Sequence, residues 1–370
     1  MKILLLSCHL YQSKNKAGFH HLADAFSKLN HSVYFCTCPN SILNLAQDLR
    51  ITSSRFYARL KSILYSFFPK SYQGITIGGY ASIVHNFANS NHFQSVITSI
   101  FLSGYSRLFA KKHCYDIVIF ESGVCLYLFH ILKKRFPKAV FIYRISDILF
   151  LIGASDHLIH YEKNLLDSFD LLVVPNQTMA QLFKEKVPSA KILMQLHGVN
   201  TNQYDVASRS PSPFDTHHNH AVYIGMSDFD WTFIERASAL FPNIQFHIIG
   251  PYEKKLTAPN VIYHGLLAFD MSLPYLAHCD IGLNIGHYLR ESDASFIKAN
   301  KPLKYIQYTY FKKPIIAPAR LMLNEPHVIS YELNDKSIAN AISEALNGQI
   351  VVQEKIHDWS KLCQDILSHC

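Results

Sequence analysis

The chain has 370 residues, which at roughly 150 residues per domain predicts two or three domains. Hydrophobic residues make up 49% of it and charged residues only 17%, which excludes a disordered or low-complexity protein. The net charge is +8, and the sequence contains neither a run of roughly 18 apolar residues nor a signal peptide, so we expect a cytoplasmic protein. Eight cysteines follow no disulfide or zinc spacing, which predicts reduced thiols.

Strand and helix patterns alternate through the first half of the chain, which predicts a parallel sheet with helices on both faces. We expect strands at Lys2–Ser7, Ser32–Thr37, Asp116–Phe120, Ala139–Tyr143, Leu171–Val174 and Lys191–Met194. Helices are expected at Gly18–Leu29, in the segment that ends at Arg135, and at His157–Leu166.

Positive charge is concentrated in the interval Leu49–Tyr115, which holds eight basic residues and no acidic one. Between Phe56 and Phe68, apolar residues recur at helical spacing beside the basic ones, which predicts an amphipathic helix on an anionic membrane. The residues expected at the membrane are Arg55, Arg59, Lys61, Phe67 and Phe68. The alternative is a core-facing helix with a solvated basic face; nucleic acid is a weaker option, and we expect no such partner.

A polar, proline-bearing stretch at Ser208–His220 indicates a domain boundary. Beyond it we expect strands at Ala221–Ile224, Gln245–Ile249, Val261–Tyr263, Ile281–Asn284 and Pro314–Ala317, and helices at Trp231–Leu240, Ser272–Ala277 and Leu303–Tyr310. The sequence thus predicts an α/β protein with two Rossmann-like domains, residues 1–205 and 221–350. Residues 206–220 would form a linker, and a helix in residues 351–370 would pack back on the first domain.

The turn after the first strand, Ser7–Tyr11, lacks the G-x-G-x-x-G of nicotinamide-binding proteins, and the sequence contains no P-loop motif. A nucleotide-sugar site remains, because ligands bind beyond the carboxyl ends of parallel strands and at domain interfaces. Three segments favour it: Tyr223–Asp230, Phe246–Gly265 and Pro302–Tyr308. The third would present free helix N–H groups together with Lys304 to a diphosphate.

Together these segments resemble the GT-B glycosyltransferases, and more closely the GumK-type glucuronosyltransferases of bacterial exopolysaccharide assembly. The matching residues are Phe120–Gly123, Tyr143–Asp147, His197–Val199, Gly225–Asp230, Pro242–Gly250, Leu303-Lys304 and Gln307-Tyr308. The resemblance implies two domains that face a cleft. It also implies an inverting transfer of glucuronic acid from UDP-glucuronate to a lipid-linked oligosaccharide, catalysed by a peripheral protein at the cytoplasmic face of the inner membrane.

The family's general base matches Asp147, and inversion needs one carboxylate that takes the proton of the attacking hydroxyl. A helix N-cap is the alternative role for Asp147, and Asp156 is the second candidate base. Retaining relatives use two glutamates seven residues apart near the donor helix. Counting on from Glu291 reaches Ala299, which favours inversion.

Donor-contacting positions of the family match Lys304 and Gln307, for which a solvated helix face is the alternative. Gly286 stands where the family has a donor-contacting tyrosine, so Tyr288 is expected to substitute for it. The predicted donor-binding residues are Gly225, Met226, Ser227, Tyr288, Leu303, Lys304 and Gln307. The loop Gly286–Lys301 is longer and more basic than the family pattern, which leaves the donor sugar open.

Near the first strand, His9, Gly18, His20 and Glu121 are expected to line the acceptor side of the cleft. A structural role is the alternative for each histidine, and a helix cap for Glu121. Three more histidines (His217, His218 and His220) lie in the predicted linker without a spaced partner set, so we expect no metal site and no cofactor.

Other functions fit the same scaffold: a GT-B transferase that uses another UDP-hexose, a UDP-sugar epimerase, or a catalytically silent sugar-nucleotide-binding protein. The basic interval favours a membrane acceptor, which a soluble epimerase would not require.

Overall fold

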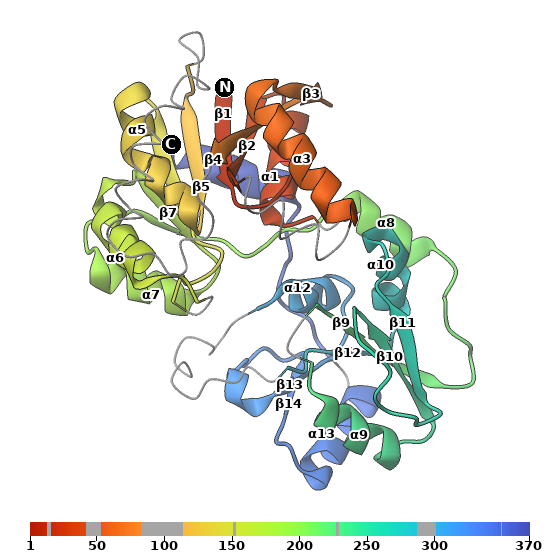
Figure 1. Ribbon diagram of the computed structural model, residues 1–370. Coiled ribbons are helices and arrows are strands. Elements are labelled where there is room, and N and C mark those ends of the chain that lie inside the picture. Colours follow the sequence, from red (N-terminus) through yellow and green to blue (C-terminus); the bar gives the residue numbers. More distant parts are fainter. Residues whose placement is uncertain are drawn as a thin grey trace. The chain divides into compact units, whose positions relative to one another are not determined.

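The computed structural model describes residues 1–12, 16–41, 53–82, 114–150, 153–226, 229–286, 301–348 and 350–370. These residues form two units, one of Met1–Gln195 with Trp359–Cys370 and one of Leu196–Asp358 (Figure 1). Each unit is an α/β domain built on a largely parallel sheet, so the predicted fold class of two Rossmann-like domains is confirmed.

The first unit has a sheet whose described strands run in the order β3-β4-β2-β1-β5-β6-β7-β8, with β3 antiparallel to β4 and the other pairs parallel. Its strands are β1 (Lys2–Ser7), β2 (Ser32–Ser41), β3 (Lys70–Tyr72), β4 (Ile75–Ser82), β5 (Ile117–Glu121), β6 (Val140–Arg144), β7 (Leu171–Val174) and β8 (Ile192–Met194). Its helices are α1 (Gly18–Lys28), α3 (Ser53–Phe67), η3 (Val124–Leu128), α5 (Phe129–Arg135), α6 (Asp156–Leu165), η4 (Leu166–Ser168), α7 (Gln177–Lys186) and α14 (Trp359–Ser368).

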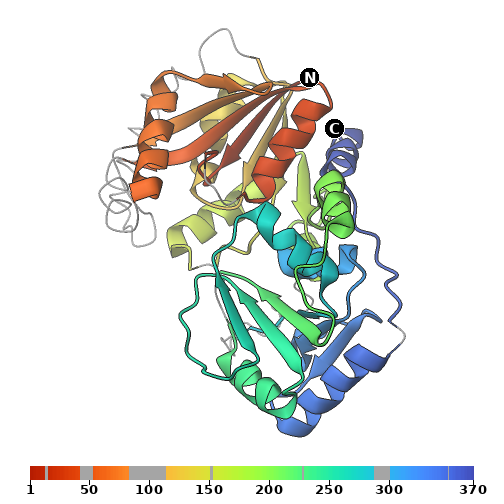
Figure 2. The ribbon, with the colours of Figure 1, turned by 90° about the vertical axis from the view of Figure 1, so that its right-hand side faces the viewer.

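The C-terminal helix α14 belongs to the first unit, where it packs against α1 (Figure 2). Apolar residues of both helices join one core cluster with Ile3 and Leu5 of β1. The backbone of α14 is also tied to the sheet side, because the Gln195 side-chain amide donates to the Leu362 carbonyl oxygen at 3.0 Å. Burial of an apolar helix stripe is the main force that holds α14 there.

The second unit has a sheet whose described strands are parallel and run in the order β11-β10-β9-β12-β13-β14. Its strands are β9 (Asn219–Ile224), β10 (Ile244–Ile249), β11 (Val261–Gly265), β12 (Ile281–Leu283), β13 (Ile315–Pro318) and β14 (Val328–Tyr331). Its helices are α8 (Thr201–Arg209), α9 (Trp231–Leu240), α10 (Phe269–His278), α12 (Leu303–Tyr310), η6 (Ala319–Leu321) and α13 (Asp335–Asn347).

The division between the units lies after Gln195, ten residues earlier than the sequence-based boundary. The reason is α8, which packs against α10 and buries Tyr204 in a core cluster of the second unit. The predicted linker over residues 206–220 is also too long, because α8 runs to Arg209 and β9 begins at Asn219.

Candidate functional site

In the first unit, polar side chains gather where three neighbouring strands end. Ser7, Glu121 and Arg144 are the last residues of β1, β5 and β6, and parallel pairing brings these ends together. The edge of a parallel sheet at the carboxyl ends of its strands is the usual position of ligand sites in open α/β sheets. The loop after β6 then carries Asp147 at the same edge.

Glu121 is a buried carboxylate, 6% exposed, whose two oxygen atoms face different partners. Its Oε2 accepts hydrogen bonds from the Ser7 hydroxyl at 2.5 Å and from the Cys8 backbone N–H at 3.2 Å. Its Oε1 lies 3.5 Å from Nε2 of His9. Burial raises the pKa of Glu121, while His9 and the two hydrogen bonds oppose that shift. Glu121 is therefore not a helix cap, and sequence analysis missed Ser7 as its partner.

Asp147 is an exposed residue of the loop between β6 and α6. Its backbone N–H donates to the Ser122 hydroxyl at 3.5 Å, which ties this loop to the end of β5. Partial desolvation raises the pKa of Asp147, and the charge of His9 acts in the opposite direction. Asp147 does not cap a helix: Ser155 is the N-cap of α6, and the second candidate, Asp156, is an exposed first-turn residue.

His20 was expected to line the acceptor side, and this expectation is wrong. The side chain is fully buried; its Nδ1 accepts from the Ala17 backbone N–H and its Nε2 contacts the Leu10 carbonyl oxygen, both at 3.0 Å. Burial lowers the pKa of His20 to about 3, so the imidazole is neutral. His20 thus closes the first turn of α1, which begins at the half-buried Gly18.

In the second unit, the chain after β10 passes so close to the backbone after β9 that only glycine fits at Gly250. A Cβ atom on Gly225 would lie 2.4 Å from the Tyr223 hydroxyl, and one on Gly250 would lie 2.2 Å from the Gly225 carbonyl oxygen. Gly250 also has a φ of +156°. Met226 follows and is exposed, so these strand ends present backbone and a flexible side chain to a ligand.

Lys304 lies in the first turn of α12, and its ammonium group is 4.3 Å from the centroid of the Tyr223 ring. This cation–π contact joins the start of α12 to the end of β9, so two of the three predicted segments meet. Pro302 occupies the N-cap position of α12, and the helix dipole adds positive potential there. The arrangement suits a diphosphate.

Lys301, the last residue of the basic loop Gly286–Lys301, is paired with two carboxylates. Its ammonium group lies 2.5 Å from Glu325 and 2.6 Å from Glu354, and Glu354 also accepts from the Tyr305 hydroxyl at 2.8 Å. One cation between two carboxylates anchors the start of α12.

The remaining predicted donor residues divide into three groups. Leu303 is 39% exposed at the start of α12. Gln307 is 3% exposed, so its side chain packs inward in this structure, and its expected donor contact stays a prediction. Ser227 and Tyr288 lie outside the described residues.

Helix α3 exposes only some of the side chains that we expected at the membrane. Arg59, expected at the membrane, is 8% exposed and lies on the inner side, so that prediction is wrong. The face turned to solvent consists of Tyr57, Lys61, Leu64 and, just after the helix, Phe68. We call these four residues the α3 outer face. The side chains of Arg55 and Phe67 lie outside the described residues. Across the described part of the chain, no helix has the length and apolarity to cross a membrane.

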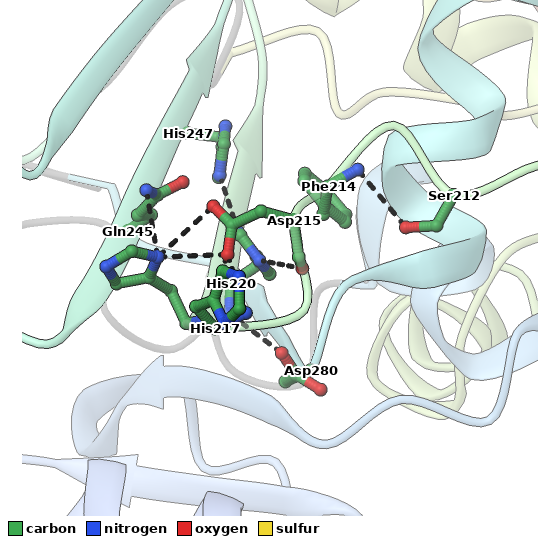
Figure 3. Close-up of polar contacts among 9 residues, drawn as sticks. Ser212, Phe214, Asp215, His217, His220, Gln245, His247 and Asp280 are labelled. Atoms are coloured by element: carbon green, nitrogen blue, oxygen red, sulfur yellow. Dashed lines mark hydrogen bonds and ion pairs between the residues drawn. The ribbon is translucent and has the colours of Figure 1, made fainter.

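Histidines that sequence analysis did not connect form a hydrogen-bonded chain across the second sheet. His220 Nδ1 lies 3.0 Å from His247 Nε2 (Figure 3). His247 Nδ1 in turn lies 2.9 Å from His264 Nε2. At the near end, His220 Nε2 lies 3.1 Å from the Asp215 carbonyl oxygen. Sequence analysis singled out only His220 of these three. The signal for His247 and His264 was a histidine within an otherwise apolar strand.

The chain of rings has one consistent set of neutral tautomers. The Asp215 carbonyl can only accept, so His220 carries its proton on Nε2 and accepts on Nδ1. Because His220 Nδ1 accepts, His247 carries its proton on Nε2 and accepts on Nδ1. His264 then also carries its proton on Nε2. Burial lowers the pKa of His247 to about 3 and also lowers that of His264. The described residues hold no cluster of histidine, cysteine or carboxylate side chains suited to a metal ion.

Comparisons with known proteins agree with this architecture. Residues 5–175 match the family model described as glucuronosyltransferase GumK, N-terminal domain. The UDP-glucuronate:glycolipid 2-beta-glucuronosyltransferase of Xanthomonas campestris pv. campestris is 23% identical over 98% of this chain and 88% of its own. The resemblance to the GumK-type glucuronosyltransferases is therefore confirmed.

Solved structures show the same GT-B fold. Sucrose-phosphate synthase from Thermosynechococcus elongatus has a TM-score of 0.67 at 11% identity, over 99% of this chain and 97% of its own. HepE from Anabaena, in complex with UDP and glucose, has a TM-score of 0.59 at 14% identity, over 100% of this chain and 98% of its own.

The histidine chain predicts acid sensitivity of the second unit. Because the folded state keeps His247 neutral, the unfolded chain binds its proton first, and stability falls as pH drops from about 6.5 towards 3. The slope from this residue is up to about 1.4 kcal/mol per pH unit. His247→Gln preserves one donor and one acceptor without titrating, so urea unfolding at pH 7 and 4.5 should show a smaller acid loss. The exposed His217→Gln is the control; equal acid loss in all three proteins would contradict the prediction.

Proposed function

We propose that this chain is a glucuronosyltransferase that transfers glucuronic acid from UDP-glucuronate to a glycolipid, without a metal or other cofactor. The observation that carries the proposal is the similarity over 98% of the chain to an enzyme with that name. The geometry supports it, because candidate acid–base and phosphate-binding groups lie at the carboxyl ends of the two sheets.

Asp147 is the proposed general base of an inverting reaction. Its carboxylate would take the proton of the acceptor hydroxyl while the sugar carbon is attacked and UDP leaves from the opposite side. Two observations support this role: Asp147 is exposed at the end of β6, and its raised pKa makes it a stronger base than an ordinary aspartate. The departing diphosphate needs positive charge at a different point, in the second unit.

Lys304 and the first turn of α12 are the proposed diphosphate-binding groups. The ammonium group is held over Tyr223, next to the glycine at the end of β9. With Gly225 and Met226 at that strand end, a UDP-sugar would meet backbone, one cation and a helix N-terminus.

We place the enzyme at a membrane surface, on its cytoplasmic face, through the α3 outer face. Three large apolar side chains there are 50–75% exposed, and Lys61 lies among them. Apolar side chains with a lysine on one helix face suit an anionic interface, where the rings insert and the ammonium group meets lipid headgroups. A glycolipid acceptor requires that proximity.

Donor binding tests the first part of the proposal. UDP-glucuronate should bind in isothermal titration calorimetry, and Lys304→Ala should weaken it about 10- to 100-fold, because a charged hydrogen bond contributes about 1.5–3 kcal/mol. Lys336→Ala, an exposed lysine of α13, is the matched control. Tighter binding of another UDP-hexose would replace the donor assignment, and unchanged affinity in Lys304→Ala would remove Lys304 from the site.

Turnover tests the base. Asp147→Asn should lower UDP release in the presence of a bacterial lipid extract by roughly 10²- to 10⁴-fold, the usual contribution of a general base, while UDP-glucuronate binding persists. In Asp156→Asn, UDP release should fall by less than about threefold. If Asp156→Asn is the inactive variant, the base assignment moves to Asp156. UDP release that does not depend on lipid would argue against a glycolipid acceptor.

Membrane binding tests the location. Replacement of Leu64 and Phe68 by glutamate should weaken co-sedimentation with phosphatidylglycerol vesicles at least about tenfold, because two apolar insertions are lost. Met271→Glu changes an equally exposed apolar residue of α10 and should bind like the wild type. Vesicle binding that survives the double substitution, or that the wild type lacks, would rule out the α3 outer face.

A further inference from the structure

The first turn of α12 has no capping side chain of its own. Pro302 occupies the N-cap position without a side-chain hydrogen bond to the helix, and α12 is only eight residues long. Short helices are marginal in isolation, because few backbone hydrogen bonds offset the cost of forming the first turn. The direction of the N–H groups at this helix start therefore depends on contacts that come from outside the helix.

One carboxylate, that of Glu354, holds both sides of this helix start. Its Oε1 lies 2.6 Å from the ammonium group of Lys301, and its Oε2 accepts a hydrogen bond from the Tyr305 hydroxyl at 2.8 Å. The Lys301 ammonium group also lies 5.2 Å from the centroid of the Tyr305 ring. Because Lys301 precedes the N-cap and Tyr305 follows it, a single side chain spans the first turn of α12.

Glu354 belongs to the connection between α13 and α14, which is itself tied down. Val199 donates its backbone N–H to the His357 carbonyl oxygen at 3.1 Å. The Asp358 carboxylate accepts from the backbone N–H of Thr201 at 3.1 Å and from its hydroxyl at 3.2 Å. These contacts fix the end of the connection to the start of α8, and the Glu354 side chain is only 19% exposed. Glu354 is therefore a supported group rather than a solvated one.

An ionic anchor is an expensive way to hold a helix. The Lys301 side chain is 14% exposed, and Oε2 of its other partner, Glu325, is buried without a hydrogen-bond partner among the described residues. Apolar residues in place of such a group are often as stable or more stable. What charged hydrogen bonds add is direction, because they hold their atoms within a narrow range of distance and angle. That property matters where a helix start has to meet a ligand.

The anchored turn carries Lys304, which directly precedes the fully buried Tyr305. Fixing Tyr305 therefore also fixes the point at which the Lys304 side chain leaves the helix. We propose that Glu354 is a positioning residue for the donor. Through Lys301 and Tyr305 it holds the first turn of α12, so that the helix N–H groups and Lys304 meet the same diphosphate. This inference rests on the proposed function, which assigns the diphosphate to that turn.

Charge alone would give Glu354 the opposite effect. A carboxylate near a diphosphate repels it, so an electrostatic role predicts tighter donor binding when the Glu354 charge is removed. A positioning role predicts weaker binding after the same change. A role in stability alone predicts unchanged affinity. The sign of the change in affinity thus separates the three roles.

Calorimetric titration with UDP measures that sign. Glu354→Gln keeps the shape and removes the charge, and it should weaken UDP binding about tenfold, the lower end of the loss when a partner that orients a binding group is removed. Tyr305→Phe removes only the hydroxyl and should weaken it about threefold. Glu344→Gln, an exposed glutamate of α13, removes the same charge elsewhere in the second unit and is the matched control. Unchanged or tighter UDP binding in Glu354→Gln would overturn the inference.

Hydrogen exchange provides a second readout that needs no ligand. Peptides that cover α12 should exchange faster in Glu354→Gln than in the wild type, and at the wild-type rate in Glu344→Gln. Faster exchange with unchanged UDP affinity would make Glu354 a structural anchor only, which also overturns the inference. If UDP binding weakens as expected but no glucuronic acid is transferred to lipid, the inference stands and the proposed function fails. A wild type that does not bind UDP would refute both.

Discussion

Parallel strand pairing brings side chains from distant parts of the sequence to one sheet edge, and both candidate sites depend on it. Because β1 pairs with β5 and β5 with β6, Ser7, Glu121 and Arg144 become neighbours although more than a hundred residues separate the first two. The backbone hydrogen bonds of the strands are satisfied within the sheet, so the amides and side chains just beyond it are left for ligands. The same rule places Gly225 and Gly250 side by side in the second unit.

Burial then sets the chemistry of these groups. In the first unit a carboxylate is taken out of water and compensated by a hydroxyl, a backbone amide and an imidazole. In the second unit three imidazoles form a chain in which each contacts the next and the first contacts a backbone carbonyl oxygen, and burial lowers the pKa of His247 and of His264. Both clusters satisfy their buried polar atoms with local partners.

The sequence was sufficient for most strands and most helices, because buried strands in a parallel sheet are nearly continuous apolar runs; it missed β3, β4 and β14. It was not sufficient for the facing of side chains. The helical wheel of α3 has apolar residues on more than one arc, and packing of α3 on β4 and β2 turned Arg59 inward. His20 was misjudged for the same reason: a polar side chain can face solvent, a ligand or the interior, and only tertiary contacts decide which. The division after Gln195 was missed because α8 pairs with α10, which lies some sixty residues further on.

The charged side chains around α12 limit which groups could provide positive potential for a donor diphosphate. The segment that ends at Lys301 is basic in sequence, yet Lys301 is shared by Glu325 and Glu354, so this group of three carries one net negative charge. Nearby, Arg320 donates to the Gly286 carbonyl oxygen at 2.8 Å. Lys301 fixes the start of the helix and cannot also neutralise a phosphate without releasing a carboxylate. In the proposed function, the described groups of this helix start that would neutralise a diphosphate are therefore Lys304 and the α12 N–H groups.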